Sequence, residues 1–316
     1  MISLKKNISV VGNIVVDFIA TPIKNIPHWG ELYNVEYPIG MNIGGNGAIA
    51  AVCAARLGLV PYLVGCVGDD IIGKRIIDML KAEKVRTDFI KQINGQSTGT
   101  TLALARKDGE RMFFHHMGSN TRLVNKHIHN IFLDDFSALL VSSVFILPGL
   151  KPEGLMTTFK NARRSGIPTI IDVAWDPTGK WKFGNIFAGA DYFLPNEVEI
   201  QHIARSRTTR KAVERLHDRG VQNIVVKQGK KGCTVYVKGR PPKRVSAPAI
   251  KPVDTTGAGD AFNAGFIKGL LKYDDVYEAS KYATATASLS VTGIGGTARA
   301  PTVKDVERVM QSQEEY

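Results

Sequence analysis

The sequence is poor in cysteine and has no long apolar run, and each shortage excludes a class of protein. Its 316 residues include three cysteines, Cys53, Cys66 and Cys233, with no Cys-x-x-Cys pair. This excludes a disulfide framework and predicts buried free thiols in a reducing cytoplasm. No stretch approaches the ~18 consecutive apolar residues of a membrane span. The start of the chain lacks the apolar core and cleavage site of a signal peptide, so we expect a cytoplasmic protein without membrane contact.

Acidic residues are scarce, above all in one part of the chain. Asp and Glu number 29 against 41 Lys and Arg, a net charge of +12. Residues 201–250 hold 13 basic residues, opposed only by Glu214 and Asp218. Such a block suits a nucleic acid or an anionic ligand such as a nucleotide, and a solvated helix face plus a basic strand is the plain alternative. Apart from Tyr236 the block has no aromatic residues to stack on bases, so nucleic acid is not the expected partner.

The rest of the composition is that of a globular protein, with 44% hydrophobic and 22% charged residues. Short apolar runs that suit buried strands alternate with helical patterns. The runs lie at residues 8–12, 62–67, 138–147, 169–173, 192–194 and 224–227. This alternation predicts an α/β fold with a largely parallel sheet covered on both faces.

Two stretches interrupt this alternation. Residues 13–41 contain three prolines, and residues 97–117 hold an Asp108-Gly109 turn between β-rich runs, which predicts a hairpin. We expect both to form antiparallel strands outside the main sheet, as a small β lid.

The most informative segment is DTTGAGDAF, residues 254–262. It opens a helical pattern, so the amides of Gly257, Ala258 and Gly259 would lie at a helix N-terminus and bind an anion. An aspartate is unexpected at a site that only binds an anion, because the Asp260 carboxylate would repel a phosphate group. It has a purpose there if it takes the proton of a hydroxyl group that attacks the phosphate. A capping aspartate beside flexible glycines is the structural alternative, and the segment alone does not decide between them.

This segment resembles the second signature of the ribokinase-like (phosphofructokinase B) family of carbohydrate and nucleoside kinases. The resemblance implies that Asp260 is the catalytic base and that residues 257–259 form the anion hole. It also implies a monovalent-cation site, such as a K⁺ site, at Asp254 and Thr256, with carbonyl ligands from residues 288–296.

The first family signature corresponds to GGNGAIAA, residues 44–51. Many relatives have Gly-Gly-x-Gly-Ala-Asn, and Ile49 stands here in place of the asparagine. Gly44, Gly45 and Asn46 are therefore expected to hold the acceptor substrate, with Asn46 supplying an amide. Close packing at the start of an Ala-rich helix is the alternative explanation of the glycines.

Further acceptor residues follow from the same resemblance. It assigns Asn13 and Asp17, after the first strand, to substrate hydroxyl groups, although Asp17 would also suit a solvated turn. It also places Asn120 with the substrate, at the end of a lid segment that contains His115 and His116. Adjacent strand residues face opposite ways, so these histidines do not form a metal site, and one of them is expected to contact the substrate.

On the nucleotide side, Asn196 and Glu199 match the family's Asn-x-x-Glu element, which implies water-mediated contact with Mg²⁺ and the ATP phosphates. The same two residues also form a capping-box pattern, and both interpretations can hold together. Lys227 stands where relatives carry a hydroxyl residue, and it would either neutralise phosphate charge or point to water. The other residues assigned to ATP are Gly229, Gly232 and Thr284.

The resemblance extends from residue 10 to about residue 300. We expect one ribokinase-like three-layer α/β/α domain over residues 1–316, with a lid from residues 13–41 and 97–117, that uses ATP and Mg²⁺ to phosphorylate a sugar hydroxyl group. The basic block would lie on the nucleotide side, and the lid is expected to form a homodimer interface. The alternatives are a nucleoside kinase on the same fold and a non-catalytic regulator that binds sugar or nucleic acid.

Overall fold

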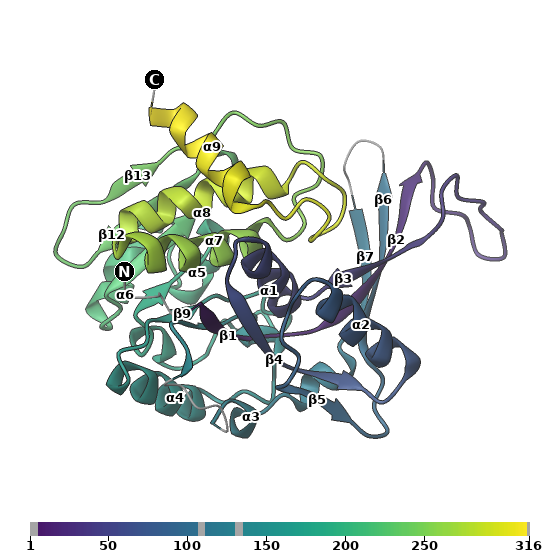
Figure 1. Cartoon of the computed structure of the whole chain (residues 1–316), viewed down its shortest axis with the longest axis horizontal. Coiled ribbons are helices and arrows are strands. Elements are labelled where there is room, and N and C mark those ends of the chain that lie inside the picture. Colours follow the sequence, from purple (N-terminus) through teal and green to yellow (C-terminus); the bar gives the residue numbers. More distant parts are fainter. Residues whose placement is uncertain (1–5, 107–110, 130–134, 315–316) are drawn as a thin grey trace.

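The computed structural model describes residues 6–106, 111–129 and 135–314 (Figure 1). At its centre is a nine-stranded sheet with the order β13-β12-β11-β10-β9-β8-β1-β4-β5. The strands are β1 (Asn7–Val11), β4 (Val60–Gly68), β5 (Ile90–Ile93), β8 (Leu139–Val141), β9 (Thr169–Ile171), β10 (Tyr192–Phe193), β11 (Asn223–Lys227), β12 (Cys233–Val237) and β13 (Lys243–Val245). In this order, neighbouring strands from β11 across to β5 all pair in parallel, whereas β12 and β13 pair antiparallel at the opposite edge from β5.

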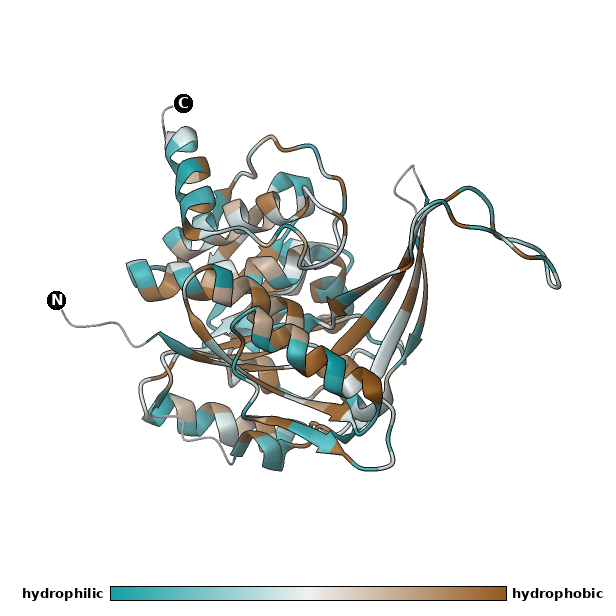
Figure 2. Ribbon diagram, turned by 45° about the vertical axis from the view of Figure 1, so that its right-hand side comes forward, coloured by the Kyte–Doolittle hydropathy of each residue, from teal (hydrophilic) through white to brown (hydrophobic). Residues whose placement is uncertain are grey.

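Helices cover both faces of this sheet, as predicted. One face carries α1 (Asn46–Arg56), α2 (Ile71–Ala82), α7 (Ala258–Tyr273), α8 (Val276–Ser290) and α9 (Val303–Glu314). The other face carries α3 (Asn125–His129), α4 (Pro152–Arg164), α5 (Glu197–Ile203) and α6 (Thr209–Asp218). Because parallel strands of this kind are buried on both sides, their sequences read as continuous apolar runs (Figure 2).

Successive side chains of each central strand enter two separate cores. In β1, Val10 packs with the first set of helices and Val11 with the second. The same alternation separates Leu140 from Val141 in β8, because neighbouring strand residues point to opposite faces. All three cysteines are buried and free, as expected. Within the described part of the chain, no helix has the length and apolar character needed to cross a membrane.

One predicted element differs from the structure in extent. The apolar run 138–147 contains only the short strand β8, because Ser143 adopts φ +62° and a 3₁₀ turn, Val144–Ile146, follows. Helix α2 begins at Ile71, since the Asp70 carboxylate accepts the Gly73 amide at 2.8 Å and caps it.

The stretches predicted as a lid form a second sheet of four strands, which stands at one side of the molecule (Figure 1). Its order is β3 (Gly40–Gly44), β2 (Val15–Ile23), β6 (Gly99–Arg106) and β7 (Arg111–His116). The β6-β7 hairpin and the β2-β3 pair are antiparallel as predicted, and the predicted turn at Asp108-Gly109 lies outside the described residues. The prediction was wrong for the pair at the centre. β2 and β6 are parallel, because both strands start at the body of the protein and run outward.

Candidate active site

The strand order of the main sheet reverses at β1, which has β4 on one side and β8 on the other. Ligands of open α/β sheets bind at such a reversal, beyond the carboxyl ends of the strands. Asn13, after β1, meets Ser143, after β8, whose hydroxyl group donates to the Asn13 side-chain oxygen at 3.1 Å. Gly45, which precedes α1 with φ +88°, packs on this loop, and a Cβ atom there would lie 2.6 Å from the Asn13 carbonyl oxygen. Only glycine satisfies both the conformation and the space.

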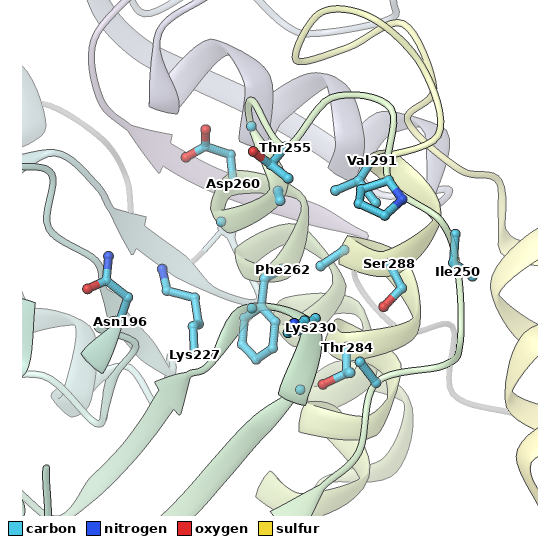
Figure 3. A pocket seen from close by; sticks show the side chains of 18 of the residues that line it. Asn196, Lys227, Lys230, Ile250, Thr255, Asp260, Phe262, Thr284, Ser288 and Val291 are labelled. Carbon is cyan, nitrogen blue, oxygen red and sulfur yellow. The ribbon is translucent and has the colours of Figure 1, made fainter. Parts of the chain in front are cut away.

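A pocket of about 910 Å³ opens beside this crevice (Figure 3). It brings together most of the predicted catalytic and nucleotide residues. Those that line it are Asn46, Asn196, Glu199, Lys227, Gly229, Gly232, Gly257, Ala258, Gly259, Asp260 and Thr284. The predicted acceptor residues Asn13, Asp17, Gly44 and Gly45 do not line this pocket. Asn46 is the predicted acceptor residue that does.

The start of α7 is the segment that the sequence predicts to be an anion hole. Gly257 adopts φ +75° immediately before the helix, and it packs so closely that a Cβ atom would lie 3.0 Å from Gly296 Cα. Among the described residues no side chain caps the first amides of α7, although the Ala258 amide donates to the Thr255 carbonyl group at 3.3 Å. The positive end of a 16-residue helix faces the pocket, and helix ends of this kind bind phosphate groups.

Asp260 lies in the first turn of the same helix and is 3% exposed. Its Oδ1 atom has no hydrogen-bond partner among the described residues. Burial raises the pKa of Asp260 to about 8, with a further contribution from the charge of Asp172, while a hydrogen bond with Asn46 opposes the shift. A carboxylate with a raised pKa and an unoccupied oxygen is prepared to accept a proton.

Lys227, at the end of β11, does not point to water, so that alternative was wrong. Its Nζ atom lies 3.0 Å from Asp172 Oδ1, and Asn263 Nδ2 donates to Asp172 Oδ2 at 2.6 Å. Nζ also lies 3.5 Å from the position that a Cβ atom on Gly259 would take, so the ammonium group borders the predicted anion hole. Burial alone would lower the pKa of Lys227, but Asp172 and then Glu199 raise it overall, which keeps the lysine charged.

Asn196 and Glu199 form the capping box of α5, so the structural interpretation of this pair is confirmed. The Asn196 side chain accepts the Glu199 amide and the Glu199 side chain accepts the Asn196 amide, both at 2.8 Å. Both side chains also line the pocket, and burial raises the pKa of Glu199 to about 7. A carboxylate and an amide oxygen are the donors that suit Mg²⁺ bound through water together with phosphate groups. The described residues contain no cluster of three acidic, histidine or cysteine side chains that would hold a metal ion alone.

The acceptor residues lie on the small sheet and the adjoining loops. The strand register aligns Asn42, Asp17, Thr101 and His115 in one row on one face of this sheet. Thr101 hydrogen-bonds the Asp17 carboxylate, and its hydroxyl group lies 3.0 Å from His115 Nδ1. Gly44 makes room for this carboxylate, since a Cβ atom there would lie 2.3 Å from Asp17 Cγ.

The two histidines of the lid take opposite faces, as the alternation of strand residues predicts. His115 joins the row that contains Asp17, whereas His116 Nε2 lies 3.0 Å from Ser97 Oγ. Of the two, His115 is therefore the one that lies with the acceptor residues.

Asn120 is not available to a substrate, so its prediction is corrected. Its side chain is fully buried, accepts the Ile14 amide at 2.8 Å and donates to the carbonyl groups of Ile14 and Met117. These bonds use both donor positions of the Nδ2 group and one acceptor position of Oδ1, and they hold the β1-β2 connection against the segment that follows β7.

Asp254 and Thr256, predicted to border a monovalent cation, face away from the pocket, toward the small sheet. The Arg111 guanidinium from β7 contacts both of them: it pairs with the Asp254 carboxylate and donates to the Thr256 hydroxyl group. The guanidinium group of Arg111 thus lies where the sequence predicted a bound monovalent metal ion such as K⁺.

Further residues also line the pocket. Asp172 and Trp175 follow β9 and line the pocket, and Trp175 is 60% exposed, with its ring 5.1 Å from that of Trp181 in an edge-to-face contact. Residues 249–252 and Val291 line it as well. The sequence could have placed Asp172 at the pocket, because this residue directly follows a buried strand and the carboxyl ends of the strands meet at the crevice. The loop 249–252 had no such signal.

Comparison with known proteins agrees with this geometry. The sequence matches the pfkB family of carbohydrate kinases over residues 5–303. It is 32% identical to the ribokinase of Bacillus subtilis over 310 residues, covering 96% of this chain and 99% of that protein. It is 25% identical to the 5-dehydro-2-deoxygluconokinase of Clostridium perfringens over 328 residues, covering 99% and 95% respectively. The structure of Arabidopsis thaliana ribokinase complexed with ribose and ATP superposes with a TM-score of 0.80 at 26% identity, covering 96% of this chain and 98% of that one.

Proposed function

The chain belongs to the pfkB family of carbohydrate kinases and is an ATP-dependent sugar kinase, and from this premise we propose that Asp260 is its catalytic base. One observation carries the proposal. Asp260 is buried, and among the described residues its Oδ1 atom has no hydrogen-bond partner and no side chain caps the adjacent amides of α7. In the proposed reaction, a hydroxyl group of the sugar gives its proton to Asp260, and its oxygen bonds to the γ-phosphorus of ATP. The bond to the β–γ bridging oxygen breaks, and ADP leaves.

The anion hole and Lys227 stabilise the charge on the moving phosphoryl group. The amides at residues 257–259 lie at the positive end of α7, where they would act on the charge of the phosphoryl group. The Lys227 ammonium group lies beside Gly259 and is held there by Asp172. Its charge therefore acts where the γ-phosphoryl group would bind.

The two ends of the pocket differ in polarity, and this difference indicates which way round ATP would bind. Asn196, Lys227 and Asp260 lie at one end, and Ile250, Val291, Thr284 and Ser288 lie at the other (Figure 3). We assign the phosphates to the charged end and adenine to the apolar end. Gly229 and Gly232, both with positive φ, form the turn between these ends, and Lys230 and Lys251 add charge to the wall.

Mg²⁺ would be held by Asn196 and Glu199 through water. When bound, it would neutralise the charge of the phosphate groups. Glu199 has a raised pKa without an ion beside it, and a bound cation would favour its charged form.

The small sheet would serve as the lid over the acceptor within one kinase domain. The row Asn42, Asp17, Thr101 and His115 offers hydrogen-bonding groups suited to the hydroxyl groups of a sugar. Closure of this face over the crevice would exclude water, which competes as the phosphoryl acceptor.

A nucleoside is the second candidate for the acceptor, because of Trp175. An exposed indole ring fixed by Trp181 at the edge of the pocket would stack on a nucleobase, which a simple sugar lacks.

Two further properties belong to this proposal. The face of the small sheet opposite Asp17 exposes Met41, Leu102 and Phe114, which supports a homodimer formed through the lid. The three buried cysteines without a disulfide bond support a cytoplasmic location.

ADP release with Mg·ATP, measured across pentoses, hexoses, sugar acids, phosphosugars and nucleosides, tests the function. The proposal is supported if the wild-type protein phosphorylates a sugar and the Asp260→Asn variant does not. Turnover of nucleosides alone would establish the second candidate. No turnover of any acceptor would refute both.

A further inference from the structure

Arg111 connects the small sheet to the loop that carries the anion hole. It is the first residue of β7, opposite Ala105, on the same face of the sheet as Asp17 and His115. Its Nη1 atom lies 2.5 Å from Asp254 Oδ1 and donates to the Thr256 hydroxyl group. The side chains of Arg111 and Asp254 are 17% and 5% exposed, so this ion pair is largely removed from water.

Asp254 in turn joins two segments behind the anion hole. Its Oδ1 atom accepts the Thr256 amide at 2.6 Å, and its Oδ2 atom accepts the Gly295 amide at 2.8 Å. Gly257 packs against Gly296 in the same region. The Asp254 carboxylate thus fixes the turn 254–257 against the segment that contains Gly295 and Gly296, and the first amides of α7 follow directly from this turn.

The charge of Asp254 needs compensation because the carboxylate is buried. Burial would raise its pKa, but the amides of Gly295 and Thr256 and the charge of Arg111 lower it overall, which keeps the carboxylate ionised. Arg111 is the cation that faces this carboxylate in an ion pair within the described residues.

A free monovalent cation does not fit this arrangement. Both Asp254 oxygens and the Thr256 hydroxyl oxygen already accept N–H groups, and a guanidinium stands against them. We propose that Arg111 supplies the positive charge that orders the anion-hole turn, in place of a free monovalent cation. Arg111 is then a positioning residue that acts through Asp254. Because it belongs to the small sheet, the order of the anion-hole turn depends on where that sheet lies.

The first test needs no substrate, so it is independent of the proposed kinase reaction. Amide hydrogen exchange would be compared in Arg111→Gln, Arg111→Lys and wild-type protein, in tetramethylammonium chloride and in KCl at about 0.1 M. Arg86→Gln is the matched control, because Arg86 forms an exposed ion pair with Asp88 at 2.9 Å. In tetramethylammonium, Arg111→Gln should exchange at least ~5-fold faster at residues 254–258 and 293–297. K⁺ should restore protection, and Arg111→Lys should retain most of it. Wild-type protein and the control should exchange alike in both salts.

The second test rests on the proposed function and uses the acceptor identified there. Wild-type kcat should agree within about 2-fold in the two salts, whereas Arg111→Gln should lose about 10–100-fold in tetramethylammonium and recover in K⁺. Strong activation of the wild-type enzyme by K⁺, or Arg111→Gln with unchanged exchange, would overturn the proposal. If no acceptor is found, the exchange experiment still decides on Arg111, so a failure of the kinase assignment is distinguishable from a failure of this one.

Discussion

At the scale of single residues, the site depends on carboxylates kept in different protonation states. Asp260 and Glu199 have raised pKa values because they are buried, whereas the pKa of Asp254 is lowered by hydrogen bonds and Arg111. Each value follows from the neighbours that tertiary folding supplies. The same residue type is thereby a fixed anion at position 254 and, at position 260, has the raised pKa proposed for the base.

Replacement of the base should stop turnover without preventing nucleotide binding. We expect Asp260→Asn to lower kcat by about 10²–10⁴-fold, because the acceptor proton then has no receiver, while the ATP Kd changes little. Steady-state kinetics and calorimetric titration with ATP would measure the two effects. Asp274→Asn, at the exposed end of the same helix, is the matched control. Near-normal kcat in Asp260→Asn would remove this residue from the mechanism.

The same variant should be more stable than the wild type, increasingly so toward alkaline pH. The pKa of Asp260 is about 8 in the folded protein and near 3.8 in the unfolded chain. The stability associated with its protonated form is therefore complete below about pH 4 and is lost as pH rises through 8. The neutral amide of the variant carries no charge to bury at any pH. Asp260→Asn should melt a few degrees higher than wild type at pH 8 and nearly alike at pH 4.5. A lower Tm for the variant at pH 8 would contradict the raised pKa.

At the scale of elements, β2 and β11 carry the residues proposed for the two halves of the site. Asp17 on β2 is proposed to hold acceptor hydroxyl groups, and Lys227 at the end of β11 to contact phosphate. Both side chains are held by protein partners, Thr101 for Asp17 and Asp172 for Lys227. Each element should therefore affect one substrate and leave the other nearly unchanged.

Asp17→Ala should raise the acceptor KM about 10–150-fold, because one charge-assisted hydrogen bond contributes roughly 1.5–3 kcal/mol, and the KM for ATP should stay nearly constant. Lys227→Met should raise the KM for ATP instead. It also leaves Asp172 buried without its partner, so the double variant Lys227→Met/Asp172→Asn separates binding from stability. Circular dichroism would establish that each variant is folded. If Asp17→Ala raises the KM for ATP and leaves the acceptor KM unchanged, the small sheet is not the acceptor site.

At the scale of the whole molecule, the small sheet stands beside the α/β/α body (Figure 1). One of its faces carries Asp17 and His115 together with the exposed Phe113, and the other exposes Leu102 and Phe114, at 40% and 58%. A sheet with an uncovered apolar face gains free energy by pairing with a second copy. The lid and the proposed dimer interface are then two faces of one element.

A charge placed on the apolar face should dissociate the proposed dimer. We expect Leu102→Glu to sediment as a monomer at a concentration where the wild type is a dimer, because burying an unpaired carboxylate at an interface is unfavourable. Ile71→Glu, at an exposed apolar position on α2 outside this sheet, should remain dimeric. A monomeric wild-type protein, or a dimeric Leu102→Glu, would refute the interface.

The sequence by itself determined what depends on local pattern. The alternation of apolar runs with helical segments predicted the three-layer fold, and DTTGAGDAF predicted the helix that starts behind Gly257. The Asn196–Glu199 pair predicted its own capping box, since a cap needs only residues three apart on one chain. These features are fixed by backbone geometry over a few residues, and so a single sequence is sufficient for them.

Only the tertiary structure decided which distant groups meet. Lys227 pairs with Asp172, 55 residues away, and Arg111 reaches Thr256 across 145 residues. The side chain of Asn120 bonds the backbone of Ile14, 106 residues away, which made a predicted ligand residue a structural one. The polar group of a lysine, arginine or asparagine does not specify its partner, because many surfaces offer a carboxylate or a carbonyl group. The partner is selected when the packing of strands and helices brings one such group within hydrogen-bond distance and excludes water from both.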